Sequence, residues 1–204
     1  VVANAAGLAG HCVWPSDADT IPLWDGIVLS HNYVGTFGTS NLTQSVAFAH
    51  ECGHYLNLHH IWGGNNVPNF YYYPCADPNK DCNIDDLVSD TPPTIGWQTC
   101  NLSGASCGNT VDNVQNAMDY SYCNIMFTQG QKTRMQACLN YTVAGRNNLW
   151  QTANLIATGT YTTSAPLCKA DFASNKTMVC PSAPSVTFTN TSYNGTFTSD
   201  RKST

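Results

Sequence analysis

The stretch His50-Glu51-Cys52-Gly53-His54-Tyr55-Leu56-Asn57-Leu58-His59-His60 decides the fold of this 204-residue chain. Histidines four residues apart project from one face of a helix, and two imidazoles on one face can bind Zn²⁺. A glutamate beside the first histidine can then act as a general base on water at that metal. We therefore predict a helix that carries two zinc ligands, His50 and His54, and a general base, Glu51.

The third histidine of the site cannot come from the same helix. His60 stands six residues after His54, and no continuous helix brings that position back to the same metal. The helix must therefore end between them. Asn57 is the expected breaking point, because asparagine tolerates the left-handed backbone conformation better than any residue except glycine. His60 is the predicted third ligand, and its neighbour His59 is the alternative.

Composition narrows the class of protein. A hydrophobic content of 42% indicates a globular chain, and a net charge of −5 argues against nucleic acid or an anionic membrane as partner. No apolar run approaches the roughly 20 residues that a membrane-spanning helix needs. Ten cysteines, an even number, many in loop-like sequence, indicate disulfides and a secreted or cell-surface protein. A second zinc site made of cysteines is the alternative, but the chain has no Cys-x-x-Cys pair.

Periodicity predicts few regular elements. We expect strands over 26–30 and 33–35, and a helix from about Leu42 to Leu56. Residues 61–117 are expected to be irregular and held by disulfides. A second helix is expected from the capping box Thr128–Gln131 to about Leu139. The remaining predicted elements are a short helix over 147–155 and a strand over 186–192.

A second block, Asn116-Ala117-Met118-Asp119-Tyr120 followed by Met126-Phe127-Thr128-Gln129-Gly130-Gln131, makes a family resemblance specific. Together with the histidine stretch it resembles the metzincin zinc metallopeptidases, and most closely their pappalysin and cytophagalysin branch (M43-like). The wording His60-Ile61-Trp62-Gly63-Gly64 and Val88-Ser89-Asp90-Thr91-Pro92 also resembles that branch. The resemblance covers about residues 8 to 160. The family has glycine where this chain has Asn57.

The resemblance implies an α+β metzincin fold: a twisted sheet with the active-site helix above it, and an irregular, disulfide-linked lower subdomain with a C-terminal helix. It implies a catalytic domain over 1–160, whose upper part we expect to be N-terminally incomplete because only 49 residues precede His50. A linker over 161–169 would follow. Residues 170–204 resemble the beginning of a PKD-type, immunoglobulin-like module, whose first strand is flanked by Cys168 and Cys180, candidates to pair with each other.

The resemblance also assigns roles to single residues. His60 becomes the preferred third ligand because it stands ten residues after His50, as the family requires. Met118 matches the methionine beneath the zinc ligands, and Tyr120 matches a tyrosine that stabilises the tetrahedral intermediate. Two disulfides are implied, Cys82–Cys107 and Cys100–Cys123. Calcium in the loop region is implied too, with Asp85, Asp86 and Asp90 as oxygen donors; aspartates that cap turns are the alternative.

The function that we predict is a secreted zinc metalloendopeptidase acting on a protein or peptide substrate. The substrate is expected to lie extended along an edge strand, for which Ile27–Tyr33 is the nearest candidate. One alternative is a non-catalytic extracellular adhesion module in which zinc is structural. Another is a hydrolase of small amides or glycans. The sequence does not indicate an oligomeric state.

Overall fold

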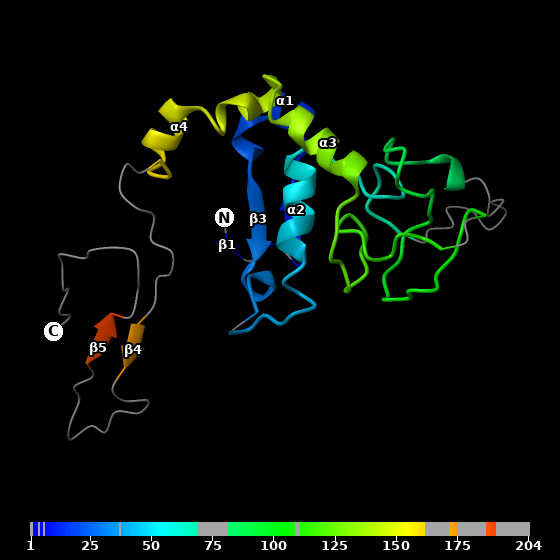
Figure 1. Cartoon of the computed structure of the whole chain (residues 1–204), viewed down its shortest axis with the longest axis horizontal. Helices are drawn as coiled ribbons and strands as arrows, with labels where there is room; N and C mark the ends of the chain where they lie inside the picture. Colours follow the sequence, from blue (N-terminus) through cyan, green and yellow to red (C-terminus); the bar gives the residue numbers. More distant parts are fainter. Residues whose placement is uncertain are drawn as a thin grey trace. The chain divides into compact units, whose positions relative to one another are not determined.

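The computed structural model describes most of the chain up to Tyr161 and two short pieces beyond it: residues 2–3, 5, 7–36, 38–68, 81–108, 111–161, 172–174 and 187–190. The chain forms two compact units, 1–150 and 151–204 (Figure 1). The pair Cys168 and Cys180 and most of the predicted PKD-like module lie outside the described residues.

The first unit contains a three-stranded sheet with β3 in its centre. Its order is β1 (Val2–Ala3), β3 (Ile27–Ser30), β2 (Gly10–Cys12), with β1 parallel and β2 antiparallel to β3. The predicted strand over 26–30 is confirmed, but its predicted position at the edge is wrong. Both sides of β3 are paired, so its backbone groups have no free side for a substrate. Among the described residues, the unpaired edge next to the helix that carries His50 and His54 belongs to β2 instead.

The segments around β3 also differ from the prediction. The predicted strand over 33–35 is not formed: the 3₁₀ turn η2 (His31–Tyr33) ends at its first residue and a bend and a turn follow. In η2, Ser30 Oγ donates to Asn32 Oδ1 over 2.7 Å. Such local side-chain bonds compete with strand pairing. Between β2 and β3 lie a helix that was not predicted, α1 (Pro15–Thr20), and the turn η1 (Pro22–Trp24). Proline is favoured in the first turn of α1 because its missing N–H needs no partner there.

Helix α2 (Ala47–Tyr55) carries the histidine stretch and packs on β2 and β3 (Figure 1). It begins five residues later than predicted, because Asn41 Oδ1 accepts the Gln44 N–H over 3.1 Å and holds a separate turn. Its end is the predicted one. Asn57 has φ 72°, and the backbone bonds Leu58 N–H to Gly53 O (2.9 Å) and Asn57 N–H to His54 O (3.0 Å) form a Schellman motif.

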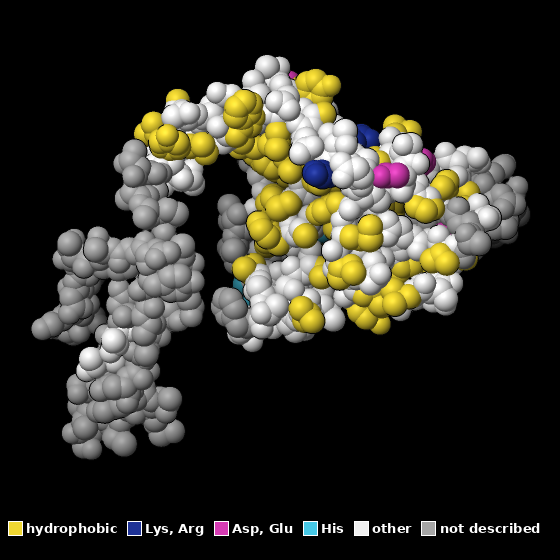
Figure 2. Space-filling view, viewed as in Figure 1, with side chains coloured by type: hydrophobic (Ala, Val, Ile, Leu, Met, Phe, Trp, Pro, Cys, Tyr) yellow, Lys and Arg dark blue, Asp and Glu magenta, His cyan; other side chains and the backbone are white. Residues whose placement is uncertain are grey.

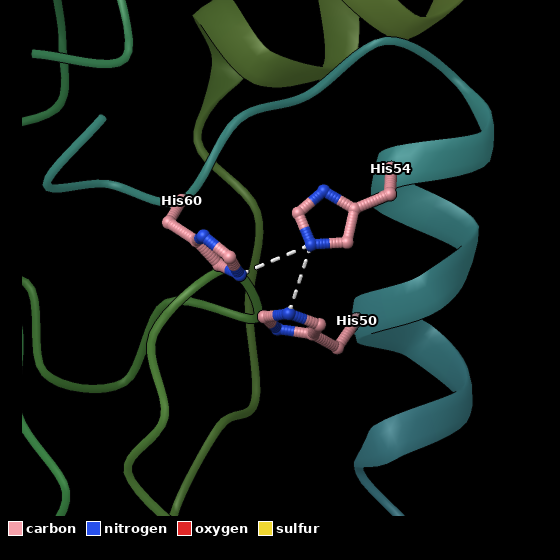
Figure 3. Close-up of side chains that lie close together, drawn as sticks. All are labelled: His50, His54 and His60. Carbon is pink, nitrogen blue, oxygen red and sulfur yellow. Dashed lines mark hydrogen bonds between the residues drawn. The ribbon is translucent and has the colours of Figure 1, made fainter. Parts of the chain in front are cut away.

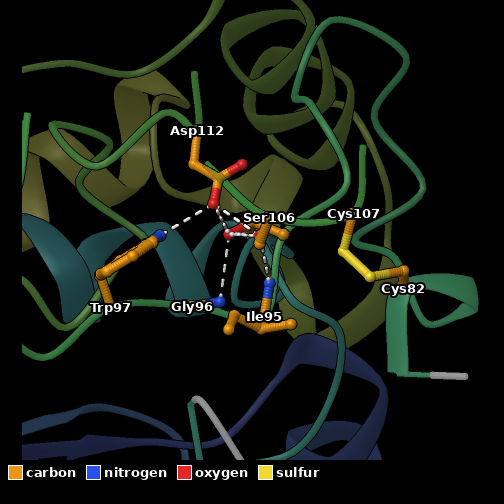
Figure 4. The surroundings of a disulfide bond; sticks show 8 residues. Cys82, Ile95, Gly96, Trp97, Ser106, Cys107 and Asp112 are labelled. Atoms are coloured by element: carbon orange, nitrogen blue, oxygen red, sulfur yellow. Dashed lines mark hydrogen bonds between the residues drawn. A yellow bond between two sulfur atoms is a disulfide. The ribbon is translucent and has the colours of Figure 1, made fainter. Parts of the chain in front are cut away.

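The irregular segment predicted over 61–117 is confirmed. Within its described residues the only helical turn is η3 (Asp81–Asn83), and no strand is present apart from isolated bridges. Both implied disulfides, Cys82–Cys107 and Cys100–Cys123, are formed. Next to Cys107, Ser106 Oγ donates to Asp112 Oδ2 (2.6 Å), which also accepts the Trp97 Nε1–H (2.9 Å; Figure 4). The disulfide therefore anchors a buried polar network that replaces regular secondary structure.

Helix α3 (Gln129–Cys138) follows, with the predicted capping box: the Gln131 N–H donates to Thr128 Oγ1, and the Thr128 N–H to Gln131 Oε1. The predicted helix over 147–155 is divided in the structure. A 3₁₀ turn, η4 (Val143–Asn148), ends the first unit, and α4 (Thr152–Ala157) begins only after the extended residue Gln151. In the second unit, β4 (Phe172–Ser174) pairs antiparallel with β5 (Phe188–Asn190), which confirms a strand within 186–192.

The hydrophobic core lies on the side of α2 away from the sheet. It consists of Leu58, Ile61, Trp62 and Met118, with Phe127 and Met135 packed against it. Figure 2 shows one face of the molecule, on which few charged side chains are visible, in keeping with a charged fraction of 10%. No helix in the described part of the chain is both long and apolar enough to span a bilayer.

Candidate metal centre and cleft

Three histidine rings converge at the end of α2. His50 and His54 project from adjacent turns of the helix, and His60 comes back from the loop after the left-handed turn at Asn57 (Figure 3). The Nε2 atom of His54 lies 3.1 Å from Nε2 of His50 and 3.1 Å from Nε2 of His60. All three rings are buried. Among the described residues this is the only group of three or more His, Cys, Asp or Glu side chains that could hold a metal.

A backbone carbonyl fixes the orientation of each ring. His50 Nδ1 lies 2.8 Å from Ala117 O, His54 Nδ1 lies 2.8 Å from Leu58 O, and His60 Nδ1 lies 2.7 Å from Asn65 O. A carbonyl oxygen can only accept, so each Nδ1 carries the hydrogen. In the neutral ring the Nε2 atom is then left with its lone pair. The three lone pairs point at one another, which is unfavourable unless a cation lies between them.

The protonation state of the rings agrees with that assignment. Burial and the neighbouring histidines lower the pKa of His50 to about 3 and that of His60 to about 2. Burial lowers the pKa of His54 to about 4. Neutral imidazoles are the form that binds zinc, and three nitrogens at tetrahedral positions around zinc would lie roughly 3.3 Å apart. The donor set therefore fits Zn²⁺.

Glu51 stands beside this group, on the side of α2 that faces the sheet edge. A Cβ atom placed on Gly10 would lie 2.7 Å from Glu51 Cγ and from Oε1, so the carboxylate packs directly against the backbone of β2. Only glycine leaves room for it. Burial raises the pKa of Glu51 to about 7, which suits a group that exchanges protons near neutral pH.

Met118 and Tyr120 belong to the turn that follows the irregular segment. Met118 is fully buried, and its Sδ would be 2.2 Å from a Cβ on Gly53, so the methionine fills the space beneath α2. The Tyr120 ring centroid is 4.9 Å from that of His60 and 5.4 Å from that of His50. Burial, and to a lesser degree Glu51, raise the pKa of Tyr120 to about 12, so its hydroxyl keeps its proton.

The turn is held from two sides. Asn116 and Gln131 exchange side-chain hydrogen bonds, at 2.9 and 3.1 Å, and the Met118 N–H donates to Asn116 Oδ1. On the other side Asp119 Oδ1 accepts the N–H groups of Trp97 and Tyr120, both at 2.8 Å. Sequence reasoning missed Asp119 as the link to the irregular segment. Its only signal was its place inside the quoted Met-Asp-Tyr stretch.

A cleft of about 790 Å³ runs past these groups. Its walls include β2 and the residues before it on one side, and the turn from Asp119 to Asn124 on the other. His50, Glu51 and His54 are part of its lining, and so is Tyr120. Two of the three histidines, the Glu51 carboxylate and the Tyr120 phenol therefore border one solvent-accessible space.

The three aspartates expected to bind calcium do not form one group. Asp90 accepts the Thr128 hydroxyl (2.7 Å) and the Gly130 N–H (2.8 Å), which is the turn-capping alternative at the start of α3. Asp86 Oδ1 accepts the Val88 N–H and the Thr91 hydroxyl, and no described group donates to its buried Oδ2. Asp85 Oδ1 accepts the Asp86 N–H. Calcium binding stays a prediction.

Comparison with known proteins assigns the family. Residues 3–140 match the peptidase M43 family, described as pregnancy-associated plasma protein-A. The chain belongs to this family. It is 35% identical over 137 residues to an extracellular metalloprotease of Arthroderma otae, a match that covers 64% of this chain and 46% of the relative. It is 30% identical over 154 residues to human pappalysin-1, covering 71% of this chain and 9% of that protein.

Among solved structures, mature mirolysin of Tannerella forsythia in complex with a cleaved peptide matches with a TM-score of 0.60 and 29% identity. This match covers 75% of the chain and 56% of mirolysin. The metzincin-like fold expected from the sequence is thus confirmed at the level of fold and family. The chain spans about half the length of the fungal relative and of mirolysin.

Proposed function

We propose that this M43 chain is the zinc-binding, catalytic part of a secreted metalloendopeptidase. The observation that carries the proposal is the convergence of three unprotonated Nε2 atoms beside a carboxylate, with His50, His54 and this carboxylate lining one open cleft. Three protein ligands leave a fourth position open, as in catalytic zinc sites, whereas structural sites close all four with protein ligands. The proposed ligands are His50, His54 and His60.

Bound zinc would supply Lewis acidity, which lowers the pKa of water and polarises a peptide carbonyl. Glu51 would accept a proton from the attacking water at its carboxylate and deliver it to the nitrogen of the leaving amine. Tyr120, whose hydroxyl stays protonated, would donate to the oxyanion that develops in the transition state. Met118 has no part in proton transfer; its proposed role is to support the ligand rings from below.

The substrate would lie along β2. This edge strand leaves one side unpaired within the described residues, and its Gly10 is in contact with Glu51. An extended peptide could add to that edge through backbone hydrogen bonds and bring its scissile carbonyl to the base. Secretion is part of the proposal, supported by the two disulfides and by the extracellular metalloproteases among the relatives. A PKD-like module from about residue 170 remains a further proposal.

The direct test is hydrolysis of a fluorescent casein by the zinc-loaded protein and by its Glu51→Gln variant. The variant is expected to bind one zinc per chain and to lose at least about a hundredfold in kcat, the range typical for removal of a general base. A chelator should abolish activity of the parent, and added zinc should restore it. Undiminished turnover by Glu51→Gln would exclude the proposed mechanism.

A matched pair of variants tests the ligand set. His60→Ala is expected to lose zinc, while His59→Ala should retain it, because the His59 ring packs at a tilt against Trp14, with ring centroids 4.4 Å apart, and does not belong to the Nε2 group. The opposite result would make His59 the third ligand. Zinc binding without hydrolysis of casein would favour a structural module, and hydrolysis confined to small amides or glycans would favour the third class of function.

A further inference from the structure

Each of the three carbonyls that orient the ligand histidines receives a second hydrogen bond from a side chain. Asn65 O, the partner of His60, also accepts the Trp62 Nε1–H over 3.1 Å. Leu58 O, the partner of His54, also accepts the Trp14 Nε1–H over 3.1 Å. Ala117 O, the partner of His50, also accepts from Asn124 Nδ2 over 3.2 Å. The same arrangement thus occurs three times, with donors from three distant parts of the chain.

Trp62 holds the most exposed of these carbonyls. Asn65 is a solvent-exposed loop residue, whereas Trp62 is buried in the core. The indole N–H binds both Asn65 O and, at 3.2 Å, Asn65 Oδ1, which in turn accepts the Val67 N–H. The ring of Trp62 also stacks on His60, with parallel planes and ring centroids 4.5 Å apart. One side chain therefore fixes the face of the His60 ring and the carbonyl to which that ring donates.

Trp14 has the corresponding role for His54: its indole N–H donates to Leu58 O, the carbonyl that orients the His54 ring. It follows β2 directly in sequence, so its indole connects the proposed substrate strand to the loop after α2. The Trp14 Nε1 atom also lies 3.3 Å from His54 Nδ1. That nitrogen carries a hydrogen of its own, so the bond to Leu58 O is the effective one. The backbone of Leu58 is held in a second way, because the Leu58 N–H donates to Gly53 O in the Schellman motif.

A carbonyl oxygen has two lone pairs, and a single donor fixes it in only one direction. When a second donor takes the other lone pair, the peptide plane can no longer rotate without breaking two bonds. The histidine ring that donates to this oxygen is then held in the plane that directs its Nε2 to the metal. Partners outside the ligand shell act on zinc affinity in this way in many metalloproteins.

We propose that Trp62 and Trp14 are positioning residues, which set the metal affinity of the site by holding the carbonyl partners of His60 and His54. The proposal rests on the proposed zinc function. Trp62 should have the larger effect, because Asn65 O has no other described anchor, whereas the backbone of Leu58 is held by the helix end. Asn124 completes the arrangement at His50.

The test compares Trp62→Phe and Trp14→Phe with Trp150→Phe. Trp150 is a matched control: its Nε1–H also donates to a backbone carbonyl, Leu139 O at 2.8 Å, but this carbonyl has no ligand histidine. Zinc affinity is measured by competition with a chromophoric chelator, and ligand geometry by the d–d absorption of the Co²⁺-loaded protein. We expect zinc affinity to fall about tenfold for Trp62→Phe and about threefold for Trp14→Phe, with a changed Co²⁺ spectrum. Trp150→Phe should match the parent in both.

Because Trp62 belongs to the core, a second variant keeps its shape. Benzothienylalanine at position 62 replaces the N–H by sulfur in a ring of nearly the same size, and it should reproduce the loss seen with phenylalanine. Affinities and spectra equal to those of Trp150→Phe in all variants would overturn the proposal. If the parent protein binds neither zinc nor Co²⁺, the proposed function itself has failed, so the two failures are distinguishable.

Discussion

We expect Arg146→Met to lower the free energy of unfolding strongly. The guanidinium is 1% exposed and donates to both carboxylate oxygens of Asp25, over 2.8 and 2.6 Å. Its Nε–H donates to Tyr55 O, the last carbonyl of α2, over 3.0 Å, and its plane lies 3.6 Å from the centre of the Tyr55 ring. Arg146 therefore connects η4, the end of the active-site helix and the segment before β3.

The expected loss of stability follows from the polar groups that Arg146→Met leaves without their donor. Methionine keeps most of the apolar contact but leaves the Asp25 carboxylate and the Tyr55 carbonyl without this donor. Breaking a buried ion pair on one side costs about 3–5 kcal/mol. Asp25 is 25% exposed, so water can replace part of the lost interaction, and we expect the lower end, about 3 kcal/mol. For a unit of this size that is a fall in Tm of roughly 6–12 °C.

The assay is urea unfolding of the metal-free protein, followed by circular dichroism. Arg134→Met serves as the matched control, because Arg134 makes a single described bond, Nη1 to Asp86 O over 2.9 Å, from the surface of α3. It should cost less than about 1 kcal/mol. The double variant Asp25→Asn/Arg146→Met should recover part of the loss, since no unpaired charge remains. If Arg146→Met costs no more than Arg134→Met, the reasoning from burial and bond geometry is refuted.

Three further predictions concern the active-site helix and a buried carboxyl. Gly53→Ala should lower the free energy of unfolding by about 1–3 kcal/mol despite the better helix propensity of alanine. The reason is that the new Cβ would lie 2.2 Å from Met118 Sδ. A Tm above that of the parent in a thermal melt would contradict this. Asn57→Ala should cost about 1 kcal/mol in urea unfolding, the penalty of a left-handed conformation, whereas Asn57→Gly should not. Burial raises the pKa of Asp86 from its ordinary 3.8 to about 6, so the folded protein binds more protons than the unfolded chain between these values, and stability falls as pH rises through them. In calcium-free buffer Asp86→Asn should therefore gain up to about 3 kcal/mol on the parent between pH 4 and pH 7, and a difference in unfolding free energy that does not change with pH would disprove it.

Features controlled by neighbouring residues could be predicted from the sequence. The helical pair His50 and His54 follows from a four-residue spacing, and the left-handed turn at Asn57 follows from the need to end the helix before His60. The capping box Thr128–Gln131 is equally local. The disulfide partners and the part played by the Met118 turn required the resemblance to a family, because nothing in their spacing specifies which distant residues meet.

The order of the strands could not be predicted. A short apolar strand such as β3 has the same sequence pattern in the centre of a sheet as at its edge, so the candidate for substrate binding was misplaced until the pairing with β1 and β2 was known. Likewise Phe48, on the active-site helix, is 53% exposed, which its apolar character does not indicate.

The helix that carries His50 and His54 and the turn that ends it could thus be predicted from the sequence alone, because each depends on backbone geometry within a few residues, whereas the preference for His60 over His59 also required the family resemblance. Their surroundings depend on the tertiary structure: Gly10 against Glu51, Arg146 on Asp25, and two tryptophans on the carbonyls behind the three histidines. Three of these contacts join residues that are 40 or more positions apart, with separations of 121 for Arg146 and Asp25 and 44 for Trp14 and Leu58. Such contacts depend on how whole elements pack, and a single sequence carries no local signal for that.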